Sequence, residues 1–256
     1  MPSILNHPII GNRYFFPRND TFLDPCWVNV PAGRLSCWRS APPSDRPILV
    51  HFHGNGEIVS DWCGAFAEWI QSRGVEVFLV EYRGYGMSDG QPELTAMLDD
   101  VTAVVEATGV PPDQLIAFGR SIGSLYATEM VSRFPQVSGL IVESGIHDLA
   151  ERILLRVSLD ELGVSKEEFH EDVRTHFDQG SKIQGFQGQS LFLHAEQDHL
   201  VGVRHAVDNH SYARPGFSEL IRLPYGDHNT ILGANMQVYL TALAEFFQEL
   251  GASSPS

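Results

Sequence analysis

The most informative part of the sequence runs Leu115-Ile116-Ala117-Phe118-Gly119-Arg120-Ser121-Ile122-Gly123-Ser124. An apolar run of strand length enters the pattern Gly-x-Ser-x-Gly, and residues 125–134, which suit a helix, follow it. A strand, a sharp turn and a helix form the context in which the serine of this pattern becomes a nucleophile. Such a turn strains the serine backbone and crowds its neighbours, so glycines at 119 and 123 have a steric reason. We therefore interpret Ser121 as a candidate nucleophile; the alternative is a Gly/Ser turn between two core elements.

The composition excludes several classes of protein. The 256 residues include 17 Lys and Arg against 32 Asp and Glu, a formal charge of −15. A surface of this sign repels nucleic acid and anionic lipid, so we expect neither as a partner. The hydrophobic fraction of 43% is enough for a packed core. We expect a single domain over residues 1–256.

The N-terminal sequence and the cysteines favour a cytoplasmic protein. Residues 1–8 contain neither a basic region nor a sustained apolar stretch, so no secretory signal is visible. No window is apolar enough to span a bilayer, and stable membrane insertion is not expected. Cys26, Cys37 and Cys63 are odd in number and form no C-x-x-C pair, which disfavours a disulfide framework or a thiolate zinc site.

Apolar strands alternate with helical segments along most of the chain. The expected strands are 26–30, 35–39, 47–52, 75–80, 115–118, 140–142, 191–193 and 220–223, the first two forming a hairpin. The expected helices are 57–72, 92–107, 125–134, 203–212 and 231–250. Because the later strands are apolar throughout, we predict an α/β fold with a mostly parallel central sheet of about eight strands and helices on both faces.

One region interrupts this alternation. About 45 residues, charged and helical in character, separate the strand that ends near Glu143 from the strand that begins at Leu191. Structureless loops of that length are uncommon, so we predict a small helical insertion over 147–189, such as a lid. The alternative is a solvated pair of helices with no role at the site.

A serine hydroxyl needs a base, usually a histidine that a carboxylate orients. In open α/β sheets such groups lie at the carboxyl ends of strands. Asp198 follows the strand 191–193, and His228 follows the strand 220–223. The order serine, acid, histidine is the one expected for this architecture. We predict a catalytic triad of Ser121, Asp198 and His228.

Other acids and histidines are weaker candidates. Asp148 is the alternative acid, because it also follows a strand. Asp227 adjoins His228, and immediate neighbours rarely orient each other's side chains, so we interpret it as a turn or capping residue. The remaining histidines of this half are interpreted as surface or strand residues: His194, His199, His205 and His210.

The oxyanion of such a reaction needs N–H donors. One is the backbone amide of Ile122, which begins the helix after the candidate nucleophile. The second should come from the loop His53-Gly54-Asn55-Gly56 after the strand 47–52. We predict the Asn55 amide, with Gly56 as the alternative; a Gly-rich turn without this role is the other interpretation.

No metal or cofactor is predicted. His51 and His53 alternate along one strand and so point to opposite faces. Metal sites require three or four convergent ligands, and no H-x-x-E-H type of spacing occurs. No phosphate-binding loop or dinucleotide fingerprint follows an early strand.

Together these residues resemble the α/β-hydrolase superfamily, from about Pro47 to the C-terminal helix. The matching pieces are His53-Gly54-Asn55-Gly56, Glu81-Tyr82-Arg83-Gly84-Tyr85-Gly86-Met87-Ser88-Asp89-Gly90, Gly119-Arg120-Ser121-Ile122-Gly123-Ser124, Asp198-His199-Leu200-Val201 and Gly226-Asp227-His228. The Tyr-Arg-Gly-Tyr-Gly piece and the arginine before the serine are most similar to the branch with protein depalmitoylases and related serine hydrolases. Peptidase-like and carboxylesterase members carry similar pieces.

The resemblance implies hydrolysis of a small-molecule or acyl substrate, an ester or thioester, through an acyl-enzyme. Ser121 would attack the carbonyl, His228 would act as base and then acid, and Asp198 would hold the histidine tautomer. The alternatives are an oligopeptidase-like amide hydrolase and a non-catalytic binding protein on the same fold. Glu81 stands where relatives commonly carry aspartate, and we expect it to affect packing around Arg83. The sequence yields no role for Arg120.

Overall fold

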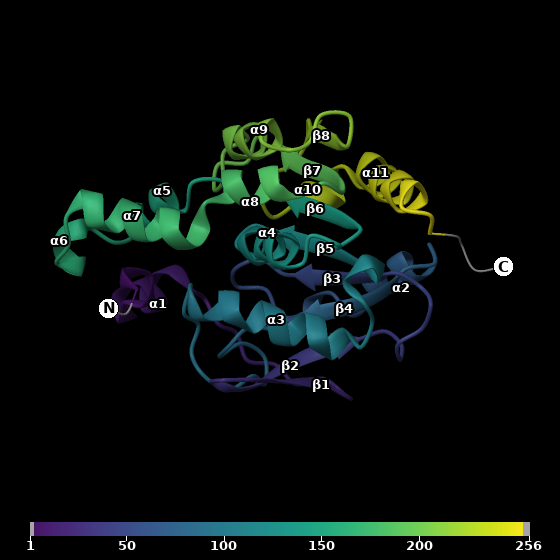
Figure 1. The fold of residues 1–256 in the computed structure, drawn as a ribbon, viewed down its shortest axis with the longest axis horizontal. Coiled ribbons are helices and arrows are strands. Elements are labelled where there is room, and N and C mark those ends of the chain that lie inside the picture. The colour runs from purple at the N-terminus through teal and green to yellow at the C-terminus, as the bar shows by residue number, and fades with distance from the viewer. Residues whose placement is uncertain (1–2, 253–256) are drawn as a thin grey trace.

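Eight strands form one sheet in the computed structural model of the protein, which describes residues 3–252 (Figure 1). The strands are β1 (Cys26–Val30), β2 (Gly33–Arg39), β3 (Ile48–Phe52), β4 (Glu76–Val80), β5 (Leu115–Arg120), β6 (Gly139–Glu143), β7 (Gln189–Ala195) and β8 (Ser218–Leu223). Their order is β1-β2-β4-β3-β5-β6-β7-β8. The pairs β1–β2 and β2–β4 are antiparallel, and all other neighbours are parallel. The predicted fold class is confirmed.

Helices cover both faces of the sheet (Figure 1). On one face lie α3 (Ala96–Thr108), α4 (Gly123–Arg133) and α8 (Gln179–Gly185), with α9 (Arg204–Ser211) beside α8; on the other lie α2 (Ala65–Gln71) and α11 (Met236–Glu249). Leu115 and Ala117 of β5 pack on the first face, and Ile116 and Phe118 pack on the second. Covering on both sides explains why this strand is apolar throughout. None of the helices between residues 3 and 252 has both the length and the apolar character that a membrane span requires.

Three predicted helices differ from the observed ones. The segment 57–72 holds only a 3₁₀ turn, η2 (Val59–Asp61), and then α2, because Gly64 separates the two. The helix expected over 92–107 begins four residues later, with α3. The helix expected over 231–250 breaks at Asn235 into α10 (Ile231–Ala234) and α11. The Asn235 side-chain amide donates to the carbonyl of Ile231 in α10 and to that of Tyr225 in the loop before it, which holds the chain at the break.

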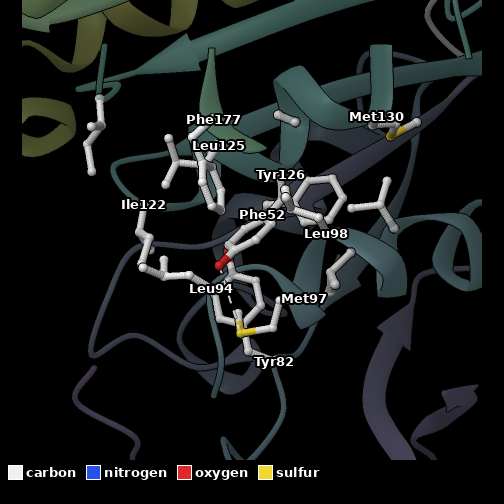
Figure 2. Close-up of a cluster of buried hydrophobic side chains, with 14 of the residues drawn as sticks. Phe52, Tyr82, Leu94, Met97, Leu98, Ile122, Leu125, Tyr126, Met130 and Phe177 are labelled. Atoms are coloured by element: carbon white, nitrogen blue, oxygen red, sulfur yellow. Dashed lines mark hydrogen bonds between the residues drawn. The ribbon is translucent and has the colours of Figure 1, made fainter. Parts of the chain in front are cut away.

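A buried cluster beneath the turn after β5 holds α4 in place (Figure 2). Phe52 of β3, Met97 of α3 and Tyr126 of α4 meet in it, and the Tyr126 hydroxyl lies 3.8 Å from the Met97 sulfur. Ile122, at the start of α4, and Phe177, from the region between β6 and β7, belong to the same cluster. Hydrophobic packing therefore fixes the helix that follows Ser121.

Four helices occupy the predicted insertion 147–189: α5 (Leu149–Leu154), α6 (Leu159–Leu162), α7 (Lys166–Phe177) and α8. The first three lie beside an N-terminal arm, residues 3–18, which contains η1 (Ile4–Asn6) and α1 (Pro8–Tyr14) (Figure 1). Arg13 of the arm pairs with Glu161 at 2.7 Å. The hydroxyl of Ser3 donates to Asp172 at 2.7 Å. The role of the insertion as a lid stays a prediction.

The turn from β5 to α4 is sterically tight. Ser121 has a φ of 54°, in the left-handed region that costs a non-glycine residue about 1–3 kcal/mol. A Cβ atom at Gly119 would lie 2.5 Å from the carbonyl oxygen of Gly123. A Cβ atom at Gly123 would lie 2.0 Å from the carbonyl oxygen of Phe52 in β3. Side chains are therefore excluded at the positions two residues before and two residues after Ser121.

Arg120, the last residue of β5, joins several elements through its buried guanidinium. Its Nη2 donates to the carbonyl of His228 at 2.7 Å. Its Nη1 lies 3.2 Å from Glu57, and its Nε lies 3.1 Å from Glu143 at the end of β6. The hydroxyl of Tyr239 in α11 donates to the other oxygen of Glu143 at 2.6 Å. Glu143 is only 1% exposed, and its burial raises its pKa despite Arg120 and the Tyr239 hydrogen bond.

We expect Gly123→Ala to lower the free energy of unfolding by at least about 2 kcal/mol, because the added methyl group collides with the β3 backbone. Urea denaturation measures this change. Gly185→Ala is the matched control: it lies in a helix, and its Cβ would have no neighbour within 4 Å. A similar loss in both variants would contradict the close approach of α4 to β3.

We expect Arg120→Met to cost about 3–5 kcal/mol of unfolding free energy, because it leaves the buried Glu143 carboxylate without its guanidinium. Arg222→Met is the control, since Arg222 pairs with Glu196 at 2.7 Å with half of its side chain exposed. That exposed pair should contribute less than about 1 kcal/mol. Equal losses in urea denaturation would show that the Arg120 contacts contribute no more than a surface pair.

Candidate active site

Ser121, His228 and Asp198 form a continuous hydrogen-bonded chain at the carboxyl edge of the sheet. Nδ1 of His228 lies 2.7 Å from Oδ2 of Asp198, and Nε2 of His228 lies 2.9 Å from the Ser121 hydroxyl. Ser121 follows β5, His228 follows β8 and Asp198 follows β7, where the ends of these parallel strands converge. All three are at most 6% exposed. The structure therefore brings the predicted triad residues into contact.

The surroundings of Asp198 keep its carboxyl group ionised. Its Oδ1 accepts hydrogen bonds from the backbone amides of Leu200 at 2.9 Å and Val201 at 2.8 Å. Burial alone would raise the pKa of Asp198, but hydrogen bonds from His194 and His228, the charge of His228 and the Val201 amide together hold it well below its ordinary value. An ionised carboxylate can only accept, so Nδ1 of His228 carries the proton and Nε2 is free to accept from serine.

The sequence suggests no role at the site for His194, yet its side chain is fully buried against Asp198. Its Nε2 donates to the carbonyl of Val201 at 2.6 Å and lies 3.4 Å from Oδ2 of Asp198. The side chain therefore packs the loop that carries Asp198 against β7.

The alternative acids have other partners. Asp148 caps α5, where its side chain accepts from the Glu151 amide at 2.9 Å. Asp227 accepts from the amides of Asn229 and Thr230, each at 3.0 Å. Within the described residues neither carboxylate contacts His228, which leaves Asp198 as its acidic partner.

The two predicted oxyanion donors lie at the same pocket as Ser121. Asn55 and Ile122 both line this pocket, and the alternative, Gly56, is not part of its lining. The Asn55 side chain is fastened to the N-terminal arm: its amide donates to the carbonyl of Tyr14, and its oxygen accepts from the Phe16 amide at 3.0 Å. The backbone of the loop is thereby held beside the serine.

Glu81 supports this loop, and the expectation that it affects packing around Arg83 is wrong. One Glu81 oxygen lies 2.8 Å from Nε2 of His53, and the other accepts from the Val59 amide at 3.0 Å. Arg83 instead forms a two-pronged contact with Asp100, with both distances 2.6 Å. Burial alone would lower the pKa of His53, but the charge and hydrogen bond of Glu81 outweigh it and raise the pKa.

The pocket beside Ser121 has a volume of about 120 Å³. The N-terminal arm contributes Tyr14 and Phe16 to its wall, and the insertion contributes Arg152 and Arg156. Larger hollows of about 530 and 540 Å³ lie elsewhere, away from Ser121. Sequence reasoning missed these four wall residues, since no local motif marks them. In residues 3–252 no three His, Cys, Asp or Glu side chains gather as metal ligands would.

Relatives from bacteria, yeast and mammals resemble most of the chain. The uncharacterized protein YfhR of Escherichia coli K12 is 26% identical over 235 residues, which cover 87% of this chain and 78% of that protein. Protein bem46 of Schizosaccharomyces pombe is 25% identical over 224 residues, which cover 85% of this chain and 73% of that protein. Human α/β hydrolase domain-containing protein 17C is 25% identical over 179 residues, 68% of this chain and 51% of that protein.

Solved structures share the fold at low identity. Esterase Pf2001 of Pyrococcus furiosus has a TM-score of 0.72 at 15% identity, covering 92% of this chain and 98% of that chain. Est1E of Butyrivibrio proteoclasticus, solved with ferulic acid, has a TM-score of 0.73 at 19% identity, covering 88% and 98%. The resemblance to the α/β-hydrolase superfamily is thereby confirmed at the level of the fold.

The model of the Hydrolase_4 family, described as serine aminopeptidase, S33, matches residues 43–181, more than half of the chain. The match begins before β3 and includes the turn with Ser121 and most of the insertion. The chain therefore belongs to the Hydrolase_4 family and is a hydrolase with the α/β-hydrolase fold.

Proposed function

We propose that this hydrolase cleaves a carboxylic ester or thioester through an acyl-enzyme formed on Ser121. The observation that carries the proposal is the chain of short contacts from the Ser121 hydroxyl through His228 to Asp198, at 2.9 and 2.7 Å. Such a chain supplies a nucleophile, a base in hydrogen-bond reach and an acid that orients the base. It opens on a pocket large enough for a small acyl group.

In the acylation step, the Ser121 oxygen attacks the carbonyl carbon while Nε2 of His228 takes the hydroxyl proton. Asp198 stabilises the imidazolium that forms. The amides of Asn55 and Ile122 donate to the oxyanion of the tetrahedral intermediate. When the intermediate collapses, the bond to the alcohol or thiol breaks, and His228 returns its proton to the leaving group.

In the deacylation step, water replaces the departed alcohol or thiol. His228 takes a proton from this water, whose oxygen attacks the acyl carbon. The second intermediate then expels the Ser121 oxygen, which regains a proton from His228. The free carboxylic acid leaves, and the three side chains return to their starting protonation states.

Amide hydrolysis is the second candidate, because the family is described as serine aminopeptidase. A panel of short peptide amides, assayed beside short-chain nitrophenyl esters, separates the two activities. A non-catalytic binding protein is the third, and it would turn over none of these compounds. The matches to esterases rest on the fold alone, so they do not decide among the three.

We expect Ser121→Ala to abolish covalent labelling by a fluorophosphonate probe and to lower ester turnover by at least about a thousandfold. Ser72→Ala, an exposed serine at the end of α2, is the matched control and should leave both unchanged. If the Ser121→Ala variant kept its labelling or its turnover, the assignment of Ser121 as the nucleophile would be refuted.

The acid is checked in the same assay. Asp198→Asn should lower turnover by about a hundredfold or more, because His228 loses the partner that fixes its tautomer. Asp148→Asn keeps the oxygen that caps α5 and removes only a charge, so its turnover should stay near that of the unaltered protein. The reverse result would assign the acid to Asp148.

We expect short acyl chains to be preferred. The pocket of about 120 Å³ is smaller than the roughly 300–1,000 Å³ of sites that enclose drug-sized ligands. Among para-nitrophenyl esters, kcat/KM should therefore fall from butyrate to palmitate. A rise toward palmitate would show that the insertion and the arm move apart to admit long chains.

A further inference from the structure

Two arginines of the insertion stand at the wall of the proposed active site. Arg152 lies in α5, and Arg156 follows four positions later, just after this helix ends. Both line the pocket that contains Ser121 and His228. Arg152 is half-buried and Arg156 is exposed, so each guanidinium can meet a molecule that enters from solvent.

Neither arginine has a carboxylate partner within residues 3–252. Arg156 stacks its guanidinium carbon 4.9 Å from the centre of the Phe16 ring, and no ion pair of Arg152 occurs in that part of the chain. The acidic neighbour Glu151 is engaged elsewhere, with Arg204. The chain has 32 acidic residues against 17 basic ones, so acids to pair with them are plentiful.

The pocket is positively charged although the protein as a whole is negative. Three arginines line it, and its lining contains no aspartate or glutamate. Arg120 is already neutralised by Glu57 and Glu143, which leaves the charges of Arg152 and Arg156 uncompensated. Both charges also act on the buried Tyr14 hydroxyl, where they oppose the burial that raises its pKa to about 12.

We propose that the natural substrate is an ester or thioester that carries an anionic group, and that Arg152 and Arg156 bind this group. The inference rests on the proposed function and names the substrate class for the same site. Guanidinium groups donate two parallel hydrogen bonds to a carboxylate or phosphate. A chain with a net charge of −15 repels anions at long range, so a local positive wall is what an anionic substrate requires.

The same wall disfavours the opposite charge. A peptide with a free α-ammonium group would bring a positive charge against two uncompensated guanidiniums. Substrates of the aminopeptidase type are therefore excluded by the inference, although the family description names that activity.

The test compares two pairs of esters that differ in charge and little in size. In the first pair the acyl side varies: para-nitrophenyl adipate, with a free carboxylate, against its methyl ester. In the second pair the leaving group varies: para-carboxyphenyl butyrate against para-carbamoylphenyl butyrate. The measured quantity is the ratio of kcat/KM, anionic ester over neutral ester. Comparing this ratio between proteins cancels intrinsic differences in ester reactivity.

In the variant that combines Arg152→Gln and Arg156→Gln, we expect the ratio of kcat/KM, anionic over neutral ester, to fall about ten- to a hundredfold in at least one pair. Arg156→Gln alone should lose less, and Arg→Lys at both positions should retain part of the ratio because the charge remains. High salt should lower the ratio of the unaltered protein. Arg73→Gln is the matched control: its guanidinium stacks 4.9 Å from the Trp69 ring, before β4 and thus at the opposite edge of the sheet.

Two outcomes overturn the inference without touching the proposed function. In the first, both proteins hydrolyse the esters in a Ser121-dependent way, and the ratio of kcat/KM is the same in the unaltered protein and the double variant for both pairs. The other is an equal loss on anionic and neutral esters, which would assign the arginines to the shape of the wall. If none of the four esters is hydrolysed in a Ser121-dependent way, the proposed function fails and this inference fails with it.

Discussion

The close approach of α4 to the end of β3 is the constraint on which the arrangement of the site depends. A Cβ atom at Gly123 would lie 2.0 Å from the Phe52 carbonyl oxygen, so the helix can begin there only with glycine. The short turn that results holds Ser121 at a φ of 54° with its hydroxyl at the carboxyl edge of the sheet. It also sets the Ile122 amide at the pocket that Asn55 lines. One steric contact thus positions the proposed nucleophile together with the Ile122 amide, one of the two proposed oxyanion donors.

A second constraint is ionic and connects the two halves of the site. The Arg120 guanidinium reaches the backbone of His228 on one side and the carboxylate of Glu57 on another. Glu57 in turn accepts from the Gly54 amide at 2.7 Å, in the loop that carries Asn55. The loop that carries His228 and the loop that carries Asn55 are therefore both linked to Arg120 of β5, the first directly and the second through Glu57. A buried ion pair adds little stability over apolar packing, so its contribution here is to fix where these loops lie.

The sheet and the three residues of the proposed triad, which the structure brings into contact, were predictable because both leave local marks in the sequence. Strands that are buried on both faces are apolar without alternation, and reactive groups of parallel sheets follow the ends of such strands. Helix bounds were less predictable: apolar spacing over 57–72 suggested one helix, and Gly64 and the η2 turn interrupt it. The partners of Arg120 could not be predicted from the sequence, and neither could the place of Tyr14 and Phe16 in the pocket wall. Contacts between residues that are far apart in the chain leave no local sequence pattern.

The attachment of Asn55 to the N-terminal arm has a consequence for how the protein loses activity on heating. The arm lies outside the sheet, and the Asn55 side chain is held by the backbone of Tyr14 and Phe16. Segments on the periphery detach at a lower free-energy cost than a central sheet unfolds. Detachment of the arm would remove a pocket wall and free the Asn55 loop while β3 and β5 stay paired. If the arm detaches before the sheet unfolds, the proposed activity is expected to be lost on heating before the fold melts.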